Sequence, residues 1–218
     1  MEVIPRHLLN NDWVSGLLLL SLVCLVFAKV GFYNRFVNFV ILPFNNKYIV
    51  LYNKKGRLLS GFHLAFSLFQ LINLGLFMYL CRELLPAWPY AEHAWLFLVI
   101  LAAILGFTLL KIAVQLLGGV IFNSEALVAA VIFKKQSYLN YSALILFAAN
   151  LLLTYLLPGS KSVIFISIFL LVLINSIGWI NILKIHQKYI ASHLFYFILY
   201  LCALEMAPYL IIFSWLNA

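Results

Sequence analysis

Hydrophobic residues fill six long runs along this chain, and short polar connections separate them. The runs cover residues 13–33, 61–81, 94–122, 138–157, 162–183 and 190–215. An α-helix rises about 1.5 Å per residue, so about 20 apolar residues cross the hydrocarbon core of a bilayer. Each run therefore predicts a transmembrane helix, and the whole chain is expected to be an all-α integral membrane bundle of about six helices.

The first run resembles a secretory signal peptide in its position near the N-terminus. Asp12 and the nearly uncharged start are wrong for such a peptide, and no small-residue cleavage site follows the run. We therefore expect this helix to be retained. The hydrophobic runs extend from end to end, which predicts a single transmembrane domain over residues 1–218.

Composition supports a lipid environment rather than a water-covered surface. Sixty-six per cent of the residues are hydrophobic and only 9% are charged, whereas soluble domains carry roughly 25% charged residues. The formal net charge of +8 fits basic flanks of membrane helices. No basic helix or aromatic platform stands clear of the apolar runs, so nucleic-acid binding is not expected.

The positive charges between the runs lie mainly on one side of the predicted bundle. Nine occur in the first, third and fifth connections, and three occur on the opposite side. The positive-inside rule then places both termini outside, in the periplasm of a bacterium. The nine are Arg35, Lys47, Lys54, Lys55, Arg57, Lys134, Lys135, Lys184 and Lys188, and the three are Arg6, Arg82 and Lys161.

Two connections on the cytoplasmic side are more than turns. Residues 36–52 are apolar and aromatic but are broken by Pro43 and are too short to cross. They are expected to lie in the membrane interface, with their rings in the headgroup zone. These rings are Phe36, Phe39, Phe44, Tyr48 and Tyr52, and the interfacial basic residues are Lys47, Lys54, Lys55 and Arg57.

Residues 124–133 form a second short apolar piece, separate from the fourth predicted span. Ser124 can cap its N-terminus, and Glu125 favours its first turn. Both pieces are predicted to be short interfacial segments.

Polar residues inside apolar spans are costly, so they are the candidate functional residues. Lys111 lies in the third run with Gln115 one turn away, and Glu205 lies in the sixth. At about 1.5 Å per residue, Lys111 and Glu205 sit roughly 13 and 22 Å from the inner face, which argues against assuming a pair. The favoured interpretation is structural, with Lys111 reaching toward the interface and Glu205 protonated or hydrogen-bonded. A proton or ion pathway is the alternative.

No catalytic or metal-binding motif appears. The chain has no phosphate-binding glycine loop, no nucleophile elbow and no C-x-x-C. Asp12 is the sole aspartate, so carboxylate-based catalysis is not expected. We expect no enzymatic activity, no metal and no cofactor. A weaker alternative is a cofactor-binding or lipid-modifying protein that uses His63, His186 and His193 near the cytoplasmic face.

Several segments resemble an uncharacterised family of multi-pass inner-membrane proteins of the Bacteroidetes, a domain of unknown function. The resemblance covers most of the chain from about Phe32 onward and implies a location in the bacterial inner membrane. It implies no activity. The segments that carry it are residues 195–205 with Pro208, Asn46-Lys47-Tyr48, Leu109-Leu110-Lys111 with Gly118 and Phe122, and Asn140-Tyr141.

Two functions follow as expectations. The first is a non-enzymatic accessory or scaffold subunit of a bacterial inner-membrane complex, with export or envelope machinery as its context. It would contact the lipid bilayer and other membrane-protein subunits. The alternative is a small proton- or ion-coupled transporter that uses Lys111 and Glu205 and has a polar cavity near mid-membrane.

Overall fold

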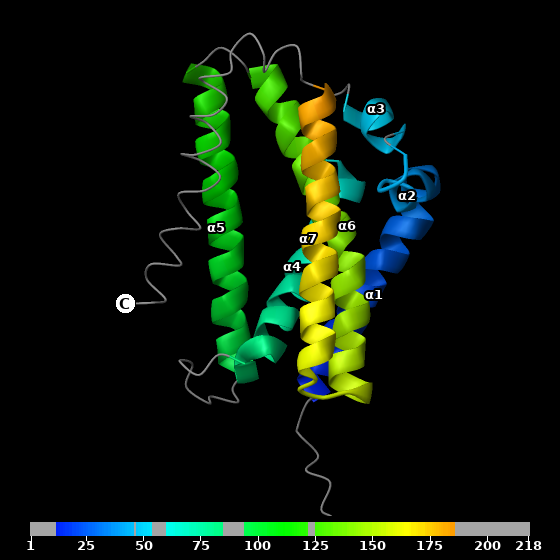
Figure 1. The fold of residues 1–218 in the computed structure, drawn as a ribbon, viewed down its shortest axis with the longest axis vertical. Coiled ribbons are helices and arrows are strands. Elements are labelled where there is room, and N and C mark those ends of the chain that lie inside the picture. The colour runs from blue at the N-terminus through cyan, green and yellow to red at the C-terminus, as the bar shows by residue number, and fades with distance from the viewer. Residues whose placement is uncertain (1–11, 46, 54–59, 85–93, 122–124, 186–218) are drawn as a thin grey trace, which may run out of the picture.

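The computed structural model describes residues 12–45, 47–53, 60–84, 94–121 and 125–185. Every element in these ranges is a helix (Figure 1). The elements are α1 (Asp12–Gly31), α2 (Tyr33–Val40), α3 (Lys47–Asn53), α4 (Gly61–Leu80), the 3-10 turn η1 (Cys81–Leu84), α5 (Ala94–Ile121), α6 (Glu125–Leu151), the π-helical turn η2 (Leu152–Leu156) and α7 (Lys161–Ile185).

Five of these helices are long and apolar enough to cross a membrane: α1, α4, α5, α6 with η2, and α7. This confirms the all-α prediction and five of the predicted runs. The sixth run, residues 190–215, lies outside the described residues. Helix α4 begins at Gly61, as the predicted run does, because Ser60 caps it, and the last residue of that run, Cys81, begins η1 instead. The Ser60 Oγ accepts a hydrogen bond from the backbone N–H of His63 at 3.3 Å.

The third connection differs from its prediction. Residues 124–133 are not a separate interfacial piece, because α6 runs without a break from Glu125 to Leu151. No proline or glycine interrupts this stretch. Lys134 and Lys135 were expected in a cytoplasmic loop, but they lie inside the apolar span of α6. Lys134 is buried there, with 2% of its surface exposed.

Helices α4 and α6 form the centre of the bundle. They pack against each other, with α1 on α4 and α7 on α6 (Figure 1). The long helices alternate in direction, so α4 and α6 are parallel. Accordingly, His63 stacks on Phe133 near one end, at 5.3 Å between ring centroids, and Asn73 meets Asn150 further along both helices. Helix α5 packs along the edge formed by α4 and α6, and its Phe97 ring also lies 5.6 Å from the Trp13 ring of α1 between centroids.

The short helices α2 and α3 lie at one end of the bundle, called here the α2–α3 end (Figure 1). The rings of Phe39 and Tyr48 are buried and lie 5.4 Å apart between centroids. Both contact Phe62 of α4. The interface prediction placed these two rings in the headgroup zone, but they are core residues. Burial of the Tyr48 hydroxyl raises its pKa above the ordinary value, although nearby Arg35 opposes that rise.

Candidate functional site

A polar seam joins α4 to α6 inside the bundle. Gln136 donates to the side-chain oxygen of Gln70 at 2.8 Å and to that of Asn140 at 3.2 Å. Asn140 in turn donates to the Ser67 hydroxyl at 3.4 Å. Hydrogen bonds between helices hold apolar bundles together where the hydrophobic effect gives little contrast with lipid. The seam therefore fixes the wall of the space beside it.

That space is a cleft of about 950 Å³ between α5 on one side and α4, α6 and α7 on the other. In Figure 1, α5 stands apart from α7 along this side of the bundle. The volume of the cleft falls at the upper end of the range for small-molecule sites. Its polar lining residues are Gln70, Thr108, Lys111, Gln115, Lys135, Gln136, Ser142, Asn175 and Ser176.

Two lysines reach this cleft from different helices. Lys111 comes from α5, and its Nζ lies 6.0 Å from the ring centroid of Phe107. Lys135 comes from α6, and its Nζ lies 5.5 Å from the ring centroid of Trp179 in α7. A cation above an aromatic face is favourable and holds the side chain in place. No aspartate or glutamate is among the described residues that line the cleft.

Neutral groups add hydrogen-bonding capacity to the same walls. Gln115 is buried, with 3% of its surface exposed, and lines the cleft one turn from Lys111. Thr108 and Asn175 donate to the backbone oxygens of Ile104 and Leu171 in their own helices, at 2.7 and 2.8 Å. These two bonds use side-chain donors, and the side-chain oxygens keep their capacity to accept hydrogen bonds.

The predicted candidates are placed as follows. Lys111 and Gln115 share a face of α5 and both line the cleft, as their spacing indicates. Glu205 lies outside the described residues. Of the interfacial basic residues, Lys47 is exposed on α3, whereas Lys54, Lys55 and Arg57 lie outside the described residues.

Sequence reasoning missed Lys135 as a site residue because it assigned residues 134 and 135 to a loop. The signal that could have found it is the lack of any helix breaker between residues 125 and 138. An unbroken helix there places Lys135 about two turns inside the apolar span that begins at Val128.

The histidines give no metal site in the described part of the chain, where no cluster of three or more His, Cys, Asp or Glu residues occurs. His63 is buried with 5% of its surface exposed, and its Nε2 has no hydrogen-bond partner among the described residues. Its stacking on Phe133 makes it part of the aromatic packing at the α2–α3 end. His186 and His193 lie outside the described residues.

The five long apolar helices fit the class of helical membrane proteins by their length and composition. The chain belongs to the family described as a domain of unknown function, DUF4271, which it matches over residues 14–216. This confirms the resemblance to an uncharacterised family and extends it toward the N-terminus from Phe32. Neither the curated proteins nor the solved structures give a significant match.

Proposed function

We propose that this chain is a small, non-enzymatic membrane carrier that binds an anionic solute in the cleft between α5 and α7. The observation that supports the proposal best is the convergence of Lys111 and Lys135, from two different helices, on one cleft. Both lysines lie within helices of membrane-spanning length. An ionisable residue at such a position is by default a candidate for a substrate or ion pathway.

Electrostatics favours an anion over other solutes. A cation surrounded by apolar walls interacts with an opposite charge far more strongly than it does in water, because the local dielectric constant is low. The amide N–H groups of Gln70 and Gln115 can donate hydrogen bonds to a carboxylate or phosphate. Apolar lining residues, including Leu74, Ile104 and Leu146, can hold the remainder of an organic anion.

Binding can be measured by thermal unfolding of the purified protein in mild detergent. Sodium phosphate, acetate and decanoate serve as probes, each compared with sodium chloride at equal ionic strength. A ligand at 100 times its dissociation constant stabilises the folded state by about 2.7 kcal/mol. We expect at least one probe to raise the midpoint by several degrees. Lys111→Gln and Lys135→Gln should each weaken that binding by about tenfold or more.

Lys29→Gln is the matched control, because Lys29 also lies in an apolar helix but does not line the cleft. It should leave the probe response unchanged. Uptake of the anion that binds is then measured in proteoliposomes that contain the protein. The two cleft variants should slow this uptake, and the control should not. A response that is equal for all salts, or equal in all variants, would reject the carrier.

Coupling to protons is assigned to Glu205 of the sixth predicted run, which supplies a carboxyl that can titrate. Glu205→Gln should abolish uptake while the protein still assembles and purifies normally. If this variant instead changes only which proteins copurify, Glu205 serves assembly and the coupling idea fails.

An accessory or scaffold subunit is the second candidate. It is favoured by α5, which lies at the edge of the described bundle and buries the smallest share of its apolar span among the five long helices. Either lipid or a second membrane protein can cover such an exposed apolar face. Purification of the tagged protein from its own membranes, followed by mass spectrometry, tests this function. Partners in fixed stoichiometry would support it, and a protein that runs alone would count against it.

The membrane and the orientation follow from the basic flanks and from the family resemblance. We assign the protein to the bacterial inner membrane, with residues 190–215 as a sixth span and both termini in the periplasm. The α2–α3 end is then cytoplasmic, because Arg35 and Lys47 lie there. Export or envelope machinery is the context in which a subunit of this kind would act.

A further inference from the structure

The α2–α3 end carries apolar side chains that membrane crossing does not explain. Helices α2 and α3 have 8 and 7 residues, which is far too short to span a bilayer. The most exposed side chain is that of Phe44, with 91% of its surface exposed. The other exposed large apolar residues here are Tyr33, Val37, Val40, Ile41, Val50 and Leu51. Together with Phe44 they are called the α2–α3 ledge.

The ledge is held firmly by the face beneath it. Phe39 of α2 and Tyr48 of α3 each have 1% of their surface exposed. Phe39 lies 4.5 Å from Phe66 and 5.6 Å from Phe62 between ring centroids, which fixes α2 on α4. An exposed apolar face on a rigidly anchored element marks an interaction surface rather than a loosely packed loop.

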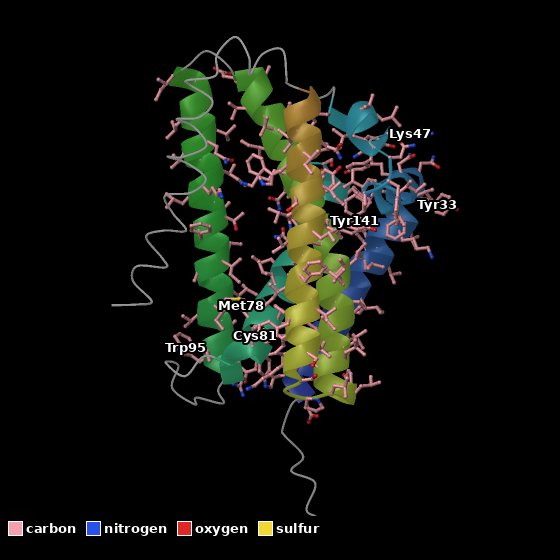
Figure 2. The ribbon with its side chains drawn as sticks, viewed as in Figure 1. Tyr33, Lys47, Met78, Cys81, Trp95 and Tyr141 are labelled. Carbon is pink, nitrogen blue, oxygen red and sulfur yellow. The ribbon has the colours of Figure 1, made fainter. Side chains whose placement is uncertain are left out.

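Positive charge accompanies these apolar residues. Lys47 begins α3 and is exposed, and Figure 2 shows it with Tyr33 on the side of the bundle away from α5. The Arg35 guanidinium lies 4.9 Å from the ring centroid of Tyr52, which joins α2 to α3. The sequence contains no aspartate or glutamate between residues 13 and 82. The ledge therefore has cations with no carboxylate nearby in the sequence.

We infer that the α2–α3 ledge is a binding site for anionic phospholipids. The exposed side chains enter the boundary between headgroups and acyl chains, and Lys47 and Arg35 contact lipid phosphates. Amphipathic helices that lie in the interface bind by this combination of apolar burial and attraction to anionic lipid. Zwitterionic lipid satisfies the apolar part only, so a preference for anionic headgroups is the diagnostic property. This inference does not depend on the proposed cleft function.

Native mass spectrometry of the full-length protein tests the site. The protein is released from mixed micelles that contain equal amounts of phosphatidylglycerol and phosphatidylcholine with identical acyl chains, and the retained lipids are counted. We expect phosphatidylglycerol to be retained several-fold over phosphatidylcholine. A cation near an anionic surface contributes about 1 kcal/mol, or about a fivefold factor in affinity. Lys47→Gln should therefore lower the preference by up to about fivefold.

Phe44→Ser should lower the retention of both lipids, because it removes apolar burial and leaves the charge intact. Lys161→Gln at the opposite end of the bundle is the matched control and should leave the preference unchanged. An unaltered preference in Lys47→Gln and in Arg35→Gln would overturn the inference. If Phe44→Ser instead converts a dimer into a monomer in the same spectra, the ledge contacts a second copy of the chain and the lipid site is rejected.

Discussion

The side-chain amide of Asn150 in α6 donates to the backbone carbonyl oxygen of Asn73 in α4 at 2.9 Å, and both residues are fully buried. The bond ties together two helices that are separated in the sequence by α5. Asn150→Ala should destabilise the protein by about 1 kcal/mol, since bonds of this kind between membrane helices contribute about 0.6 kcal/mol on average and about 1.7 at most. Thermal unfolding in detergent measures the loss.

Asn175→Ala is the comparison for that variant, because the Asn175 amide donates within its own helix, to the Leu171 carbonyl oxygen. It should change stability by less than about 0.5 kcal/mol. Equal losses in the two variants would mean that the bond between α4 and α6 has no special role.

Helices α6 and α7 approach closely at Gly178. A methyl group added there would lie 2.7 Å from the Tyr138 ring. Gly178→Ala should force the helices apart and cost about 1–3 kcal/mol, as overpacking does in well-packed interiors. The unfolding midpoint in detergent reports this change. The Tyr138 hydroxyl also accepts a hydrogen bond from Asn181 at 2.8 Å, which holds the ring against the glycine.

Gly106→Ala is the matched control for this prediction. Gly106 lies in α5, and nothing is within 4 Å of an added methyl group. Because alanine favours a helix over glycine, this variant should be neutral or slightly stabilising. A loss at Gly106 equal to that at Gly178 would show that glycine removal, rather than contact with Tyr138, causes the effect.

Cys81 follows α4 at the end of the bundle opposite to α2 and α3, where Figure 2 shows it near Met78. Burial raises the pKa of its thiol to about 11. The reactive thiolate is then about 0.1% of the population at pH 8, against roughly a quarter for a thiol with a pKa near 8.5. A variant that keeps Cys81 alone should therefore react with iodoacetamide roughly 100-fold more slowly than the unfolded chain. Similar rates of reaction with iodoacetamide in the folded and unfolded protein would contradict burial of the Cys81 thiol.

The same shift predicts a pH effect on stability with a definite sign. The folded state holds the Cys81 proton to a higher pH than the unfolded state does, so it binds more protons above pH 9. The contribution of this group to stability is complete below that pH and is lost as the pH rises toward 11. Cys81→Ala should reduce the loss of stability at alkaline pH in detergent. If stability falls with pH equally in the variant and in the unchanged protein, the Cys81 thiol does not have a raised pKa.

The number of spans decides on which side the C-terminus lies. Six crossings would return it to the side of the N-terminus, which we propose to be the periplasm. Alkaline phosphatase fused after Ala218 should then be active in intact cells, and green fluorescent protein at the same position should be dark. The opposite pair of results would reject a sixth crossing by residues 190–215.

Five of the helices could be predicted from hydrophobicity alone, because each needs only an apolar stretch long enough for the membrane. Residues 134–137 could not be assigned in the same way. Two lysines followed by glutamine and serine look like a cytoplasmic flank in one dimension. They continue α6 because Gln136 and Ser137 find hydrogen-bond acceptors at Gln70 and at the Phe133 carbonyl oxygen. The Gln70 acceptor belongs to α4 and becomes evident only when the packing of the helices is known.

The cleft was half predictable for a related reason. The spacing of Lys111 and Gln115 correctly placed both on one face of α5. The opposite wall forms only because α6 and α7 lie across from α5, and no local sequence pattern predicts that arrangement of the helices. The aromatic residues at the α2–α3 end show the same limit. Phe39 in α2 and Phe44 in the connection to α3 are the same residue type in the same apolar stretch, but Phe39 is buried and Phe44 is exposed.

The pairing of α4 with α6 also has a consequence for how the chain enters the membrane during synthesis. Helix α4 leaves the ribosome before residues 81–151 have been made, and its span is the least hydrophobic of the five. At about 5–20 residues per second, the donors in α6 that bond to the Asn73 oxygens and to the Ser67 hydroxyl are made on the order of ten seconds after α4. During that interval α4 must remain at the translocon or be held by an insertion chaperone. Codon changes that slow translation within α6 should therefore lower the yield of inserted protein more than the same changes within α7.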